Sequence, residues 1–215
     1  MKKHTELIEC DTFYHIYNRG INGESIFKKE TNYIFFLAQY AKYIQPVADT
    51  YAYCLLNNHF HLLIKTKEEK EIIDGKKNNF NNIENWIPKS TSYKSGSFYI
   101  SNQFAKLFNS YSQAINKEEN RTGSLFESPF RRIKVLSDSY FSQLVYYIHN
   151  NPQKHGFVSN FRDYPHSSYH SHLVAERTKL KREELLKWFG NREQYEIFHG
   201  MNHNEREIDK LIIEF

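Results

Sequence analysis

The chain has little of what marks secreted, low-complexity or membrane-spanning proteins. Its two cysteines, Cys10 and Cys54, have neither metal-ligand spacing nor a disulfide framework around them, which favours a reducing, cytoplasmic environment. Only 8 glycines and 5 prolines occur in 215 residues, which excludes collagen-like and disordered chains. The N-terminal residues lack an apolar stretch of signal-peptide length, and no apolar run is long enough to cross a bilayer. We therefore expect a globular, cytoplasmic protein without a membrane role.

The chain also lacks a large excess of positive or negative charge. A formal net charge of +4 indicates little about partners by itself. Its distribution is more informative, because residues 176–215 hold eight Lys and Arg against nine Asp and Glu, whereas the rest of the chain holds 21 against 16. The basic excess thus lies outside the C-terminal segment. Aromatic residues are abundant instead, at 16% of the chain, and provide material for a sizeable core.

The order of the expected elements indicates an α+β fold. Hydrophobic periodicity predicts, in chain order, strand 12–18, helix 30–45, strands 51–56 and 59–65, helix 98–117, strand 124–135 and helix 137–151. A β-α-β-β-α-β order predicts a ferredoxin-like (split β-α-β) antiparallel sheet with helices on one face. The strand over residues 59–65 is expected to be central, with one face under a helix.

Two segments fall outside this core. Residues 67–97 are rich in Lys, Asn and Ser with few apolar side chains, which predicts a surface insertion. Residues 176–215 have the pattern of charged amphipathic helices, so we expect a C-terminal helical extension after a functional domain over residues 1–175. The mixed charge of this extension is compatible with packing on the core, with nucleic-acid binding and with a partner contact.

The most informative stretch is His59-Phe60-His61 on a predicted strand. Residues two apart on a strand point to the same face, so the two imidazoles project side by side while Phe60 points to the opposite face. Neutral imidazole is a common metal ligand, and a same-face pair supplies two nitrogens without any loop closure. The alternative is two structural histidines on a half-exposed strand, and spacing alone leaves both readings open.

A second pair lies on the helix expected over residues 137–151. Tyr147 and Asn151 are four residues apart, so they share one face of that helix. Together they can present a nucleophile and an amide oxygen ligand. The alternative is that Tyr147 is a core aromatic and that Asn151 caps the helix before Pro152.

Joined to the histidine strand, these residues resemble the HUH single-tyrosine transposases, most closely the REP-associated tyrosine transposase branch. The likeness covers roughly residues 12–170 and rests on several motifs in the expected order. They are Tyr14-His-Ile-Tyr-Asn-Arg-Gly20, Asn58-His-Phe-His-Leu-Leu63, Arg121-Thr-Gly-Ser-Leu-Phe-Glu-Ser-Pro-Phe-Arg131, Tyr147-Ile-His-Asn-Asn-Pro152 and Tyr164-Pro-His-Ser-Ser-Tyr169. Several ordered motifs together are more specific than any one of them.

The chain departs from the family pattern in three places. Asn57-Asn58 stands where the family usually has a Met-Pro or similar pair, and Phe126 stands where tryptophan is common. We assign no chemistry to either position. The stretch over residues 67–96 is enlarged, which puts the contacts to a target sequence in doubt rather than the reaction.

The resemblance implies cleavage and rejoining of single-stranded DNA at or near hairpin (REP-like) sequences. Tyr147 is then the nucleophile that forms a 5′-phosphotyrosine and leaves a free 3′-hydroxyl. The ligands of Mg²⁺ or Mn²⁺ are then His59, His61 and Asn151. The relatives include monomers and homodimers, so either state is compatible with the resemblance.

Basic residues in the same motifs are candidates for nucleic-acid binding. They are Arg19, Arg121, Arg131, Arg132 and Lys134. Aromatic residues lie between them, and basic side chains with interleaved aromatics are typical of single-strand-binding surfaces. For any one of these residues alone, a solvated surface charge is the better interpretation, and only the set matches a single-strand-binding surface.

Two other functions share the same residues. One is a non-cleaving DNA- or RNA-binding regulator on the same scaffold, and the other is a metal-dependent phosphoesterase that acts on small nucleotides. The phenol, both histidines and Asn151 are all retained, which favours an active nuclease. No residue is identified as the base for Tyr147, and His149, two residues on, is expected to face away in a structural or DNA-contact role.

Overall fold

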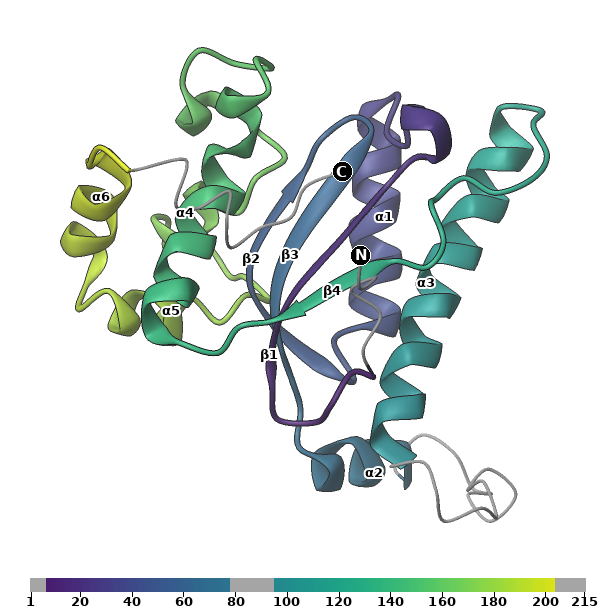
Figure 1. The fold of residues 1–215 in the computed structure, drawn as a ribbon, viewed down its shortest axis with the longest axis horizontal. Helices are drawn as coiled ribbons and strands as arrows, with labels where there is room; N and C mark the ends of the chain where they lie inside the picture. Colours follow the sequence, from purple (N-terminus) through teal and green to yellow (C-terminus); the bar gives the residue numbers. More distant parts are fainter. Residues whose placement is uncertain (1–6, 78–94, 204–215) are drawn as a thin grey trace.

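A four-stranded antiparallel sheet forms the centre of the computed structural model, which describes residues 7–77 and 95–203 (Figure 1). The strand order is β2-β3-β1-β4. The strands are β1 (Phe13–Arg19), β2 (Ala48–Leu55), β3 (His59–Thr66) and β4 (Arg131–Lys134). This arrangement confirms the predicted α+β, ferredoxin-like sheet with the histidine strand β3 in a central position.

Helices cover both faces of the sheet (Figure 1). The main helices are α1 (Glu30–Tyr43), α2 (Glu69–Lys77), α3 (Ser95–Glu118), α4 (Asp138–Lys154), α5 (Arg182–Trp188) and α6 (Arg192–Gly200). Single 3-10 turns occur at Ile21–Gly23, Phe161–Asp163 and His170–His172. The two helices of the ferredoxin-like core, α1 and α3, share one face as predicted, whereas α4, α5 and α6 lie on the other. Among the described helices, none is both long and apolar enough to span a membrane.

The two-residue period of β3 sorts its side chains between two cores. Phe60, Leu62 and Ile64 are buried in the core beneath α1 and α3. His59, His61 and Leu63 point to the opposite face, where Leu63 joins the core beneath α4. One strand therefore anchors an apolar core on one face and presents both imidazoles on the other.

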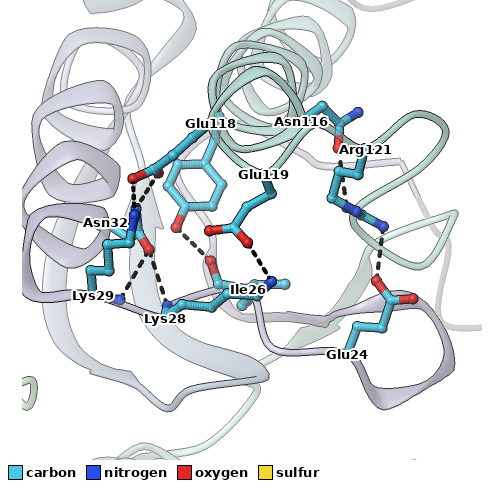
Figure 2. Close-up of polar contacts among 10 residues, drawn as sticks. Glu24, Ile26, Lys28, Lys29, Asn32, Asn116, Glu118, Glu119 and Arg121 are labelled. Carbon is cyan, nitrogen blue, oxygen red and sulfur yellow. Dashed lines mark hydrogen bonds and ion pairs between the residues drawn. The ribbon is translucent and has the colours of Figure 1, made fainter.

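Polar contacts join the start of α1 to the end of α3 (Figure 2). Lys28 pairs with Glu119 at 2.8 Å and Lys29 with Glu118 at 2.7 Å. The Asn32 side-chain oxygen accepts the backbone N–H groups of Lys28 and Lys29, while its amide nitrogen donates to Glu118. Exposed ion pairs contribute little each, about 0–1 kcal/mol. The cap by Asn32 fixes where α1 begins.

The fourth strand is shorter than the sequence predicted. Residues 124–135 were expected to be extended throughout, but β4 covers only Arg131–Lys134. Pro129 has no N–H to donate to a ladder and lies just before the strand, which explains why regular pairing starts after it. Ahead of it, Phe126 makes a single bridge to Gly20.

The helix α4 is longer than predicted. We expected it to end at Asn151 before Pro152, yet it continues to Lys154. Proline removes only one donor, and the N–H of His155 still donates to the Asn151 carbonyl at 3.0 Å, so the last turn closes. The extension adds Lys154 to the helix face that carries Tyr147.

Within the predicted insertion over residues 67–97, the structure places α2 and the first turn of α3, with Ile72 of α2 buried. Residues 78–94 lie outside the described residues. Helices α5 and α6 confirm the helical character of the C-terminal segment, and their Leu185 and Tyr195 are buried beside α4. The division of the chain at residue 175 stays a prediction.

Candidate active site and nucleic-acid interface

The two strand histidines project from β3 toward α4. His61 is fully buried and His59 is 8% exposed. Their ring centroids lie 5.2 Å apart, with the ring planes nearly perpendicular. The structure therefore places both imidazoles on one face, as the two-residue spacing predicted.

Helix α4 brings the second predicted pair to the same place. The Asn151 side-chain oxygen Oδ1 lies 3.2 Å from Nε2 of His59. One turn earlier, the ring of Tyr147 meets the ring of His61 edge-on, with centroids 5.4 Å apart. All four residues predicted for nucleophile and metal binding therefore converge between β3 and α4.

His59 has an amide oxygen at each ring nitrogen: Asn58 Oδ1 lies 2.7 Å from Nδ1 and Asn151 Oδ1 lies 3.2 Å from Nε2. A neutral imidazole has one N–H, so it donates to only one of them, and the shorter contact favours the proton on Nδ1. Nε2 of His59 then presents a lone pair to the Asn151 oxygen. Two ligands in adjacent octahedral positions at about 2.1 Å from an ion lie about 3 Å apart. The donor set thus fits a hard divalent cation.

Buried polar atoms without a hydrogen-bond partner gather at this site. In the part of the chain that the structure describes, six such side-chain atoms occur, and four of them belong to His15, His61, Tyr147 and Asn151. The other two are the ring nitrogens of His172. An unsatisfied buried polar group costs about 1–3 kcal/mol. The site is therefore poorly satisfied by the protein alone, which is the property of a ligand-binding site.

Burial keeps both imidazoles neutral. It lowers the pKa of His59 to about 4, with a further contribution from His155. It lowers the pKa of His61 well below the ordinary value of 6.5, helped by repulsion from His15 and His59. A neutral ring is the form that binds a metal. Within residues 7–77 and 95–203, no three His, Cys, Asp or Glu side chains group as a metal site, so a cation here depends on the amide of Asn151.

Four neighbours of this site were missed at the level of sequence. Nε2 of His15 on β1 lies 2.9 Å from Nδ1 of His61. Nζ of Lys154 lies 5.2 Å from the centroid of the Tyr147 ring, and the ring of His155 lies 5.0 Å from that of His59. Lys154 follows Tyr147 by seven residues, a spacing that would have indicated a shared face had the helix been extended past Pro152. The fourth is Asn58, to which we had assigned no chemistry.

His149 faces away from the site, as expected. It is fully buried, and its ring nitrogens contact Nε2 of His199 at 3.0 Å and the Ser168 hydroxyl at 2.8 Å. These contacts join α4 to α6 and to the segment before the last 3-10 turn. Complete burial favours the structural role over the DNA-contact role.

The predicted nucleic-acid residues divide between the two faces of the sheet. Arg19 lies opposite His59 in the β1–β3 register, and Arg131 lies opposite Tyr17 in the β1–β4 register, so both belong to the histidine face. Glu127 pairs with Arg19 at 2.7 Å and with Arg131 at 3.8 Å. A nucleic-acid phosphate at this position would compete with Glu127 for both guanidinium groups.

The other three basic residues do not share that face. Arg132 and Lys134 lie opposite Ile16 and Tyr14, whose side chains enter the core beneath α1 and α3. Arg132 lies over the Phe130 ring at 4.9 Å and lines a hollow of about 570 Å³ between α3 and residues 123–130.

Lys134 pairs with Glu9 at 2.9 Å. Arg121, just beyond the end of α3, pairs with Glu24 at 2.8 Å and donates to Asn116 (Figure 2). Both cations therefore pair with carboxylates of this chain. Because the predicted basic residues lie on different faces of the sheet, they do not form one continuous patch.

Comparison with known proteins finds similar chains. A Haemophilus influenzae protein named as a candidate REP-associated tyrosine transposase is 26% identical over 130 residues, which are 60% of this chain and 62% of that protein. A solved structure described as a REP-associated tyrosine transposase bound to a REP hairpin has a TM-score of 0.55 and 17% identity, covering 81% of this chain and 87% of the other. This chain is similar to REP-associated tyrosine transposases. No family model matches it.

The comparisons confirm the resemblance drawn from the ordered motifs. The sequence match supplies the link to REP-associated tyrosine transposases, and the structural match shows that the fold is shared. The matched segment is less than two thirds of the length of the Haemophilus protein. The activity of this chain is therefore argued below from its own residues.

Proposed function

We propose that this chain is a metal-dependent single-stranded DNA endonuclease and strand transferase that acts at hairpin-forming, REP-like sequences. The observation that carries the proposal is the convergence of a buried phenol, two neutral imidazoles and an amide oxygen, with most of their outward polar atoms unsatisfied. A small-molecule phosphoesterase would need no nucleophilic tyrosine at this point. A structural cluster would satisfy its own polar atoms.

Mg²⁺ or Mn²⁺ fits the donor set of His59, His61 and Asn151, which would hold it. When bound, such a cation supplies Lewis-acid polarisation of the scissile phosphate. Tyr147 Oη then attacks phosphorus, so that a bond forms between Oη and phosphorus while the bond from phosphorus to the 3′ oxygen breaks. The phenolic proton is lost, and the departing 3′ oxygen takes up a proton. The products are a 5′-phosphotyrosine and a free 3′-hydroxyl.

Lys154 supports the nucleophile. Tyrosine has an ordinary pKa near 10, so its phenol is mostly protonated at neutral pH. The ammonium group of Lys154 lies 5.2 Å from the Tyr147 ring, close enough to stabilise negative charge that develops on the phenol oxygen or on the phosphate under attack. Its position one turn beyond Asn151 keeps it on the face that the DNA strand must approach.

Hairpin DNA is the partner that the comparisons favour. The solved structure with the matching fold is described as bound to a REP hairpin. In this chain, Arg19 and Arg131 flank the histidine face, where the strand to be cleaved must lie, while Arg132 and its hollow belong to the other face. The active species is a monomer or a homodimer, and light scattering on the purified protein distinguishes these two states.

The test is covalent capture of DNA. The full chain is incubated with hairpin-bearing single strands and Mn²⁺, and a denaturing gel is examined for a protein–DNA adduct. We expect an adduct with the natural protein and none with Tyr147→Phe. The matched control is Tyr146→Phe, because Tyr146 precedes the nucleophile on α4 but packs against His203 and His199. That variant should form the adduct.

The other outcomes separate the rival functions. Hairpin binding without any adduct, in a protein that binds Mn²⁺, would identify a non-cleaving regulator. Hydrolysis of small nucleotide esters without an adduct would identify a phosphoesterase. An adduct that persists in Tyr147→Phe would contradict the assignment of the nucleophile.

A further inference from the structure

Each histidine of the proposed metal site has a second partner behind it. Nδ1 of His59 contacts Oδ1 of Asn58 at 2.7 Å, and Nδ1 of His61 contacts Nε2 of His15 at 2.9 Å. The two Nε2 atoms point elsewhere, toward Asn151 in one case and into the site without a partner in the other. In both histidines, therefore, Nδ1 contacts a neighbouring side chain and Nε2 does not take part in that contact.

Asn58 determines the tautomer of His59. Its amide nitrogen lies 3.4 Å from the carbonyl oxygen of Gly23, which fixes the amide orientation and leaves Oδ1 facing His59. Amide oxygens face both ring nitrogens of His59, and the shorter contact, to Asn58, favours the tautomer with the proton on Nδ1 and a lone pair on Nε2.

His15 has the corresponding place behind His61. Both rings are fully buried, and Tyr17 stacks on His15 with centroids 4.7 Å apart, so the contact has little freedom to change. A contact of 2.9 Å between two ring nitrogens requires that one of them donates a proton and the other accepts it. When His61 is the donor, its Nε2 is a bare lone pair directed into the site.

We propose that Asn58 and His15 are positioning residues that hold His59 and His61 in the same tautomer, with protonated Nδ1 and bare Nε2. This inference rests on the proposed metal site and specifies how it is preorganised. Hydrogen-bond partners behind ligating histidines orient the rings and set their tautomer, and losing one typically weakens metal binding 10–100-fold. Both partners reach the site from outside α4 and touch neither Tyr147 nor Asn151 by a hydrogen bond.

The first test reads the tautomers directly, in the metal-free full chain without DNA. Two-bond ¹H–¹⁵N correlation spectra distinguish a protonated from a bare ring nitrogen. We expect His59 to show protonated Nδ1 in the natural protein and in Asn58→Asp, which keeps an acceptor. In Asn58→Leu the remaining acceptor is Asn151 Oδ1 at Nε2, so the proton of His59 should shift from Nδ1 toward Nε2. An unchanged tautomer in Asn58→Leu would overturn the proposal for Asn58.

The second test measures Mn²⁺ affinity by electron paramagnetic resonance of the free ion. Asn58→Leu and His15→Phe should bind Mn²⁺ about 10–100-fold more weakly. Asn58→Asp and His15→Gln keep an acceptor at the same place and should stay within about threefold of the natural protein, well below the change expected for loss of a partner. Equal affinity in all four variants would overturn the proposal.

The two tests separate this inference from the proposed function. If no DNA adduct forms but the tautomers and Mn²⁺ affinities change as stated, the positioning roles hold and the nuclease assignment fails. If the protein binds no Mn²⁺ at all, the metal site and this inference fail together. Asn58 is partly exposed in a turn, so Asn58→Leu is expected to fold even if the buried substitution His15→Phe does not.

Discussion

The two faces of the sheet are built on opposite principles. Beneath α1 and α3, apolar side chains fill the space, and Phe60 packs against Phe36 and Phe126. Beneath α4, the next residue along the same strand, His61, faces Tyr147 with an unsatisfied ring nitrogen. The first face supplies stability. The second gives up some stability to keep polar atoms available for a ligand, so substitutions on the two faces should have opposite consequences.

The largest contrast is expected for His61→Leu. It removes a proposed metal ligand and should abolish both Mn²⁺ binding and the DNA adduct. It also removes the unpartnered Nε2 of His61 but ends the hydrogen bond between Nδ1 and His15, and these two effects oppose each other, so the free energy of unfolding should stay within about 1 kcal/mol of the natural value. Urea denaturation and the adduct gel measure the two effects. A large loss of stability would show that His61 is a structural histidine.

Phe60→Ala should do the reverse. Phe60 is fully buried in the core beneath α1 and α3, and truncating a buried phenylalanine typically costs about 3–5 kcal/mol. The molecules that remain folded should still form the adduct, because the side chain points away from the histidine face. Urea denaturation at 25 °C measures the loss. Full stability with lost activity would contradict the division between the faces.

Lowering the pH should destabilise the histidine face of the sheet before it affects the apolar face. The folded-state pKa of His59 is lowered to about 4, whereas the unfolded chain titrates near 6.5. Between these values the unfolded state binds more protons, so stability falls as the pH falls from about 6.5 toward 4, by up to about 1.4 kcal/mol per pH unit for this group. His59→Gln should flatten that slope in pH-dependent urea denaturation. An unchanged slope would show that folding does not lower the pKa of His59.

The smallest effects are expected at the neighbouring residues Arg131 and Arg132, which lie on opposite faces of β4. Arg131→Ala should reduce the salt dependence of single-strand binding by about one phosphate contact, a slope change near 0.7, and weaken binding several-fold. Arg132→Ala should affect cleavage less, because its side chain lies on the α3 side. Fluorescence anisotropy at several salt concentrations compares them. Identical losses in binding and cleavage would place both arginines on one DNA path.

Local patterns determined most of the fold and the core of the site. The two-residue period around Phe60 predicted that both histidines lie on one face of a strand. The four-residue spacing of Tyr147 and Asn151 predicted that these two residues lie on one face of a helix. What those patterns lack is the contact between distant segments. The contact between His15 and His61, 46 residues apart, depends on the β1–β3 register, which places His15 opposite Leu63 and His61 opposite Tyr17, so that the two histidines are diagonal neighbours on one face. The basic residues were grouped by sequence proximity, although alternation along β4 sends them to different faces.

Helix ends were the other weak point. Pro152 is a strong local signal for termination, but the next turn still closes through the His155 N–H, and Lys154 thereby joins the site. A rule based on one residue does not include the packing that holds α4 against the sheet.

The most direct test of the central claim is mass spectrometry of the DNA-linked peptide after proteolysis of the trapped adduct. The chain has 16 tyrosines, so the position of the link is informative. We predict a 5′-phosphate ester on Tyr147 and on no other residue. A link at any other tyrosine, or no link in a protein that binds both Mn²⁺ and hairpin DNA, would contradict the account.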